Sequence, residues 1–107
     1  MIIDNQTTSR LTVIHASQFI ASIEIEPATR KYVPEHIFDT NVVKSKIGKV
    51  IITTEYCERS FESHGHITAY ESDEVDDNDM KVIVIENMGK AESTNHIQNT
   101  SEVEYGL

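Results

Sequence analysis

Three residues near the middle of the chain have the types and the spacing of a metal site. Glu62, His64 and His66 alternate along a predicted strand, and alternate residues of a strand point to the same face. Zinc normally takes four ligands, and the sequence offers no fourth. A lone His-x-His pair is common, so we expect no bound metal and no other cofactor. We interpret the row as a solvent-facing surface or a pH-sensitive interface, because His titrates near neutral pH.

Two other features could carry chemistry. The single cysteine, Cys57, could serve as a nucleophile, but a lone cysteine at a strand end more often packs as a small hydrophobe. Residues 71–79 include six acids, but they lack the central glycine and the closing glutamate of a calcium loop. We therefore expect an exposed loop there, kept open by self-repulsion. Without a phosphate loop, an HExxH motif or a nucleophile elbow, we expect no enzymatic activity.

Charge and composition restrict the partners. The 107 residues have a formal net charge of −9, which argues against direct nucleic-acid binding, since phosphate contacts require lysine and arginine clusters. The charge suits a protein partner with a basic patch. One cysteine cannot form an internal disulfide, and no apolar run is long enough to span a membrane. The first ten residues lack the pattern of a signal peptide, so we expect no secretion and no membrane partner.

The distribution of apolar residues indicates a mainly β fold. Isoleucine and valine are abundant, and their β-branched side chains suit a pleated, half-buried surface. The pattern predicts a small antiparallel β-sandwich or partly open barrel of about six strands. The clearest alternation joins Phe19, Ala21, Ile23 and Ile25 on one face. The expected strands cover residues 10–15, 19–26, 31–33, 49–56, 61–70 and 80–86.

Short helical turns are expected within residues 34–47. Pro34 suits a first helical turn, and Asp39 or Thr40 can cap a second segment over residues 41–47. Gly48 would end that segment in the left-handed conformation. In the strand at 61–70, Gly65 predicts a bulge or a close backbone approach.

The chain divides into one β-rich domain, residues 1–87, and a polar C-terminal arm, residues 88–107. The arm holds too little apolar surface to order itself alone. We expect partner contacts from its apolar side chains and from the acidic run. These candidate interaction residues are Asp73, Glu74, Asp76, Asp77, Ile97, Val103, Tyr105 and Leu107.

Five features follow one another in the first half of the chain: the opening at residues 3–7, the strand at 10–13, the proline turn within 23–30, the Val-Pro pair within 33–38, and the segment 41–51 with its closing glycine. In this order they resemble a small β-rich module found among the structural proteins of tailed bacteriophages. The turn is Pro-Ala here, where the module usually has Pro-Gly. The resemblance covers residues 2–55 and implies a role in virion assembly, as head decoration, neck, or tail accessory, without catalytic residues.

Three functions therefore compete. The first is a non-enzymatic virion protein, made in the host cytoplasm, that binds a major capsid, neck or tail protein in symmetric copies through strand edges and the arm. The second is a small acidic inhibitor that occupies the nucleic-acid site of a basic partner. The third is a metal-dependent enzyme built on Glu62, His64 and His66, which would require stoichiometric metal.

Overall fold

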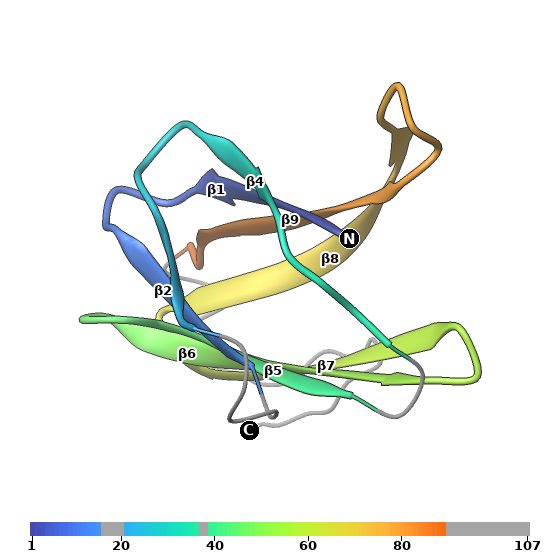
Figure 1. Ribbon diagram of the computed structural model, residues 1–107. Helices are drawn as coiled ribbons and strands as arrows, with labels where there is room; N and C mark the ends of the chain where they lie inside the picture. The colour runs from blue at the N-terminus through green and yellow to red at the C-terminus, as the bar shows by residue number, and fades with distance from the viewer. Residues whose placement is uncertain (16–20, 37–38, 90–107) are drawn as a thin grey trace.

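The described part of the chain folds into nine strands that form two facing sheets, as seen in a computed structural model (Figure 1). The structure describes residues 1–15, 21–36 and 39–89. One sheet has the order β4-β1-β9-β8 and the other β3-β2-β5-β6-β7. The strands are β1 (Ile2–Gln6), β2 (Leu11–His15), β3 (Ile23–Ile25), β4 (Arg30–Tyr32), β5 (Thr40–Ser45), β6 (Gly48–Glu55), β7 (Glu58–Gly65), β8 (Ile67–Val75) and β9 (Lys81–Asn87). The prediction of a mainly β, sandwich-like fold is confirmed, with nine described strands instead of about six.

Aliphatic side chains from both sheets fill the space between them. In β2 and β6, alternate residues point inward, as the period of two dictates. Strand β9 is different, because four consecutive aliphatic residues are buried, as is typical of a strand covered on both faces. The core consists of Met1, Ile3, Leu11, Val13, Ile25, Val33, Val43, Val50, Ile52, Ile67, Ala69, Ile83 and Ile85.

The first strand departs from the sequence prediction in two ways. Residues 2–6 form β1 although no strand was predicted there, and β1 pairs with β9 in parallel. The sandwich is therefore not purely antiparallel. Asn5 of β1 can be buried because its side chain is fully hydrogen-bonded. Its amide donates to the backbone carbonyls of Ser9 and Ile25, and its Oδ1 accepts from Thr7. These bonds fix the crossing from one sheet to the other.

The helical prediction within residues 34–47 was wrong. Residues 40–45 form β5, residues 46–47 turn, and β5 pairs with β6 along its whole length. Val43 and Ile47 lie four residues apart, which suggested one helical face, but Asn41 and Val43 face inward at a period of two. Gly48 opens β6 opposite Ser45 and ends no helix. Residues 34–36 are not helical, and residues 37–38 lie outside the described part.

A corner at Gly65 splits the predicted strand 61–70 into β7 and β8. Gly65 has a φ of 80°, and a Cβ built on it would lie 2.6 Å from the carbonyl oxygen of Ile47. The predicted close backbone approach is therefore confirmed. Past this corner the chain joins the other sheet, and β8 continues to Val75, so much of the loop expected at 71–79 is strand.

The other predicted strands lie close to observed ones. Strands β2, β4, β6 and β9 each match their predicted range to within a residue or so at either end. Of the strand expected at 19–26, residues 23–25 form β3, and residues 19–20 lie outside the described part. The described residues include no helix long and apolar enough to cross a membrane.

Candidate interaction surface

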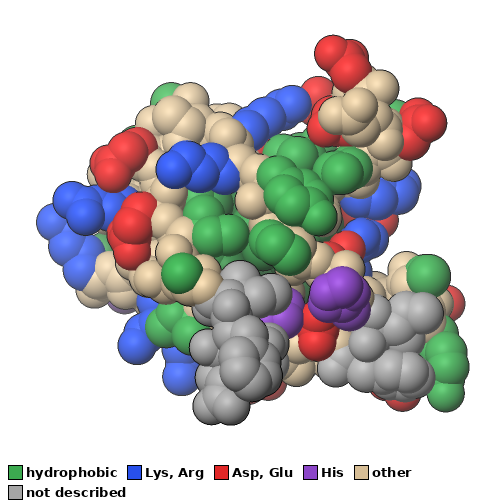
Figure 2. Space-filling view, viewed as in Figure 1, with side chains coloured by type: hydrophobic (Ala, Val, Ile, Leu, Met, Phe, Trp, Pro, Cys, Tyr) green, Lys and Arg blue, Asp and Glu red, His purple; other side chains and the backbone are tan. Residues whose placement is uncertain are grey.

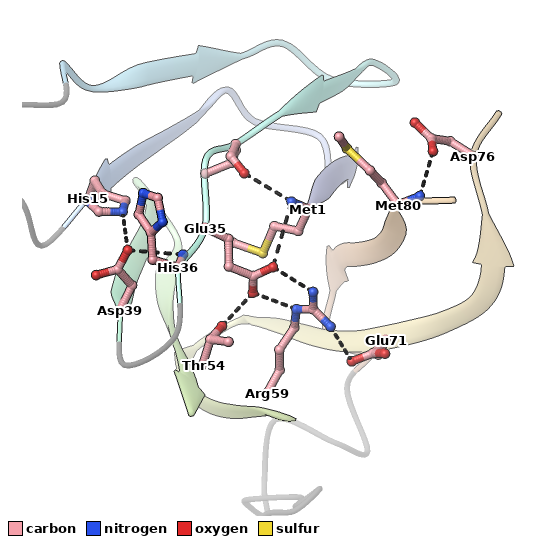
Figure 3. Close-up of polar contacts among 11 residues, drawn as sticks. Met1, His15, Glu35, His36, Asp39, Thr54, Arg59, Glu71, Asp76 and Met80 are labelled. Carbon is pink, nitrogen blue, oxygen red and sulfur yellow. Dashed lines mark hydrogen bonds and ion pairs between the residues drawn. The ribbon is translucent and has the colours of Figure 1, made fainter. Parts of the chain in front are cut away.

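A buried ion cluster joins the two sheets at one end of the sandwich (Figure 3). Glu35, in the connection between β4 and β5, accepts two hydrogen bonds from Arg59 of β7, at 2.6 Å to Nη2 and 2.7 Å to Nε. Thr54 of β6 donates to the same carboxylate. Arg59 also lies 3.3 Å from Glu71 of β8. The side chains of Glu35 and Arg59 are only 11% and 12% exposed, so this pair is largely shielded from water.

The cluster holds Glu35 in its ionised form. Burial alone would raise the pKa of Glu35, but the hydrogen bonds from Arg59 and Thr54 and the charge of Arg59 outweigh it, and the pKa lies below its ordinary value. The Met1 ammonium group, 3.8 Å from Glu35, acts in the same direction. A general acid needs a pKa near the working pH. Glu35 is therefore arranged to tie elements together and not to transfer protons.

A second polar contact fixes the same connection. The Nε2 atom of His15, at the end of β2, lies 3.0 Å from Oδ2 of Asp39, and the backbone N–H of His36 donates to that oxygen. The N–H of Thr54 donates to the Asp39 carbonyl. Beside them, Asn41 is fully buried, and among the described residues neither polar atom of its side chain has a hydrogen-bond partner. The connection from β4 to β5 is thus held to the five-stranded sheet at several points.

Only two of the three candidate metal ligands, Glu62 and His64, lie in contact with each other. His64 Nε2 lies 2.7 Å from Glu62 Oε2 on the exposed face of β7. His66 follows the strand at the corner, where its N–H bonds to the Ile47 carbonyl. Within the described ranges, no group of three histidine, cysteine or acidic side chains is placed to hold a metal ion. Glu62 and His64 therefore form an exposed surface pair.

Cys57 lies in the turn between β6 and β7 and is exposed, so the prediction that it packs as a small hydrophobe was wrong. Tyr56 and Cys57 have φ values of 54° and 68°, as a tight two-residue hairpin requires. This geometry points Tyr56 into solvent, where it is 71% exposed.

The acidic run forms the end of the β8–β9 hairpin, and Figure 2 shows acidic side chains on this projecting tip. Glu74 receives two hydrogen bonds from Arg30, whose Nε also bonds to Asp4. The Arg30 bond holds the pKa of Glu74 below its ordinary value. Asp76 accepts from the backbone N–H groups of Asn78 and Met80 and so shapes the turn.

The predicted interaction residues therefore differ in role. Glu74 and Asp76 are held by internal bonds, whereas Asp73 and Asp77 are exposed, together with neighbouring Asp79. In the described part of the chain, no lysine or arginine pairs with these three carboxylates. Ile97, Val103, Tyr105 and Leu107 lie outside the described residues.

Sequence reasoning missed the ion cluster at Glu35 and Arg59 and the contact of His15 with Asp39. The partners in each pair are 24 residues apart, and nothing in the local pattern joins them. One signal in the sequence could have revealed the ion cluster. Arg59 lies on the same inner face of β7 as Phe61, and a charged residue at an inward position needs a buried partner.

Comparison with known proteins adds no relative: no protein-family model, curated protein or solved structure matches the chain.

Proposed function

We propose that this protein is a non-enzymatic structural protein of a tailed-bacteriophage virion, serving as a head decoration or a neck or tail accessory. The observation that carries the proposal is the division between the interior and the surface. Shielded polar side chains such as Glu35, Arg59 and Thr54 bond to one another across separate elements, while edge strands and an acidic hairpin lie at the surface. Such a molecule is suited to docking on a larger shell or tube protein.

The C-terminal arm would add reach and avidity. Its first two residues, Met88 and Gly89, belong to the described part, and the N–H of Met88 donates to the His66 carbonyl at the corner. An extended arm of about 18 residues spans on the order of 60 Å, enough to reach a neighbouring subunit. Repeated weak contacts in a symmetric assembly then add up to stable attachment. Neither nucleic acid nor membrane is needed as a partner.

Truncation tests the proposal. A variant ending at Gly89 keeps every described strand and the Met88 bond, so its unfolding midpoint should match that of the full chain. Its incorporation into particles should fall to background, as measured by co-sedimentation with assembled shells or tubes. Incorporation of the truncated chain at the full-length level would contradict a role for the arm.

A small acidic inhibitor of a basic partner is a second candidate, favoured by the three exposed carboxylates of Asp73, Asp77 and Asp79. Its binding should weaken steeply with salt. Replacing the three by asparagine should reduce binding to a basic partner, and Asp76 must be left intact because it shapes the turn. The matched control replaces Glu24, Glu26 and Glu55 by glutamine, which removes the same charge elsewhere. Equal binding by both triple variants would rule this function out.

A further inference from the structure

Strand β7 is an edge strand whose outer side pairs with no described strand. It is the last strand of the order β3-β2-β5-β6-β7 and is eight residues long. The strand carries charged side chains, including the inward Arg59, but its backbone is interrupted by no proline and no bulge. Its pairing with β6 is regular from Glu58 to Gly65. A regular edge of this length, with its outward N–H groups intact, can accept a strand whose charges are complementary.

The hairpin geometry shows which backbone groups point outward. Tyr56 and Cys57 form a two-residue turn, so the flanking pair of Glu55 and Glu58 exchanges hydrogen bonds. Hydrogen-bonded pairs recur at every second residue, so the even-numbered residues of β7 bond to β6. The N–H and C=O groups of Arg59, Phe61 and Ser63 therefore point to the outer side.

The side chains of β7 separate by face. The outer face of the sheet carries Glu58, Ser60, Glu62 and His64, all of them exposed. On the inner face, Phe61 is half-buried and packs against the edge of the core. An antiparallel partner strand must therefore place no like charge opposite Glu58, Glu62 or His64 on the outer face, and it must cover Phe61 on the inner face.

We propose that β7 pairs with β7 of a second copy of this chain, antiparallel and about a two-fold axis at Phe61. Only registers that pair odd residues with odd ones use the outward backbone groups. An axis at Ser60 would place Glu58 opposite Glu62 of the second copy, and an axis at Glu62 would place the two Glu62 side chains opposite each other. With the axis at Phe61, Glu58 faces His64 of the second copy, and no like charges oppose.

This arrangement joins the two five-stranded sheets into one continuous sheet. It forms about six backbone hydrogen bonds, from Arg59, Phe61 and Ser63 of each copy. The two Phe61 rings cover each other at the inner edge. Because the contact is isologous, it closes at a dimer. The dimer goes beyond the proposed function, since it does not depend on any larger partner.

The mass of the full-length chain in solution tests the pairing. Light scattering behind size exclusion, over a concentration series, should give a dimer that dissociates on dilution. Ser63→Pro should weaken it more than about tenfold, because proline removes an outward N–H that no internal ladder uses. Circular dichroism and thermal unfolding establish that the variant is folded. A full-length chain that stays monomeric up to about millimolar concentration would overturn the proposal.

A charge exchange tests the register without touching the backbone. His64→Glu puts like charges opposite at two symmetric places and should weaken the dimer by up to about tenfold. Adding Glu58→Lys to that variant should restore it. Lys44→Glu, which makes an even larger negative charge change but on the exposed face of β5, should leave the dimer unchanged. If His64→Glu and Lys44→Glu behave alike, or the double variant is not restored, the proposed register is wrong, whatever happens to Ser63→Pro.

Discussion

The side chain of Arg59 shows how a single residue can join the two layers of a small sandwich. It belongs to β7 of one sheet and donates from Nη1 to Glu71 of the other, while Glu35 of the connecting segment accepts from its Nε and Nη2. A buried pair of this kind adds little beyond what well-packed apolar groups would supply, but removing one partner leaves the other charge buried and unpaired. The cluster therefore makes the arrangement of the layers sensitive to one substitution.

Replacing Arg59 by methionine should lower the free energy of unfolding by about 2–3 kcal/mol, because Glu35 loses its main partner. Urea denaturation measures the loss. Adding Glu35→Leu should recover most of it, since the unpaired carboxylate is gone. Arg10→Met, which breaks an exposed pair with Glu26, is the control and should cost less than about 0.5 kcal/mol. Equal losses for Arg59→Met and Arg10→Met would contradict the buried cluster.

Glu35 should also make stability depend on pH in acid. Its pKa in the folded state lies below the ordinary value of 4.5. Its stabilising contribution is therefore complete above pH 4.5 and is lost as the pH falls through the folded pKa. Unfolding of the wild type and of Glu35→Gln, measured between pH 6 and 3, should give a difference that shrinks toward low pH. A constant difference across that range would show that Glu35 carries no such shift.

Among the single strands, the sequence period predicted those in which apolar and polar residues alternate cleanly. It failed where the apolar positions fit both a strand and a helix. Strands β2 and β6 follow from alternation alone. Strand β5 was missed because Val43 and Ile47 also fit a helix, and only its pairing with β2 and β6 decides between the two. Strand β1 was not predicted because Asp4 and Asn5 look solvent-exposed. Their partners lie far along the chain, in Ile25 of β3 and Arg30 of β4, and let both side chains be buried.

The corner between β7 and β8 depends on Gly65. Replacing it by alanine should cost about 2 kcal/mol or more, because its φ of 80° disfavours a side chain and the added Cβ would meet the Ile47 carbonyl oxygen. Thermal or urea unfolding measures the cost, with Ser63→Ala in the same strand as the control. Full stability of Gly65→Ala would mean that the corner has a different backbone geometry.

For the molecule as a whole, the sequence was enough to predict the fold class but not the assembly of its polar groups. Fold class depends on composition and local period, which the chain displays in its many isoleucine and valine residues. The polar contacts depend on pairs that meet through folding, such as Arg30 with Glu74, which are 44 residues apart. The acidic run could be recognised in advance, but not the finding that Glu74 and Asp76 are used internally while Asp73 and Asp77 remain exposed.

The proposed function requires this protein to dock on a larger particle through its surface. Gradient sedimentation of the full-length chain with assembled phage shells or tubes, in physiological salt, tests it most directly. We predict that the full-length chain sediments with the particles at a fixed ratio to their subunits. The chain ending at Gly89 should stay at the top of the gradient. If the full-length chain binds neither shells, tubes nor complete particles, the proposed role as a virion protein is wrong.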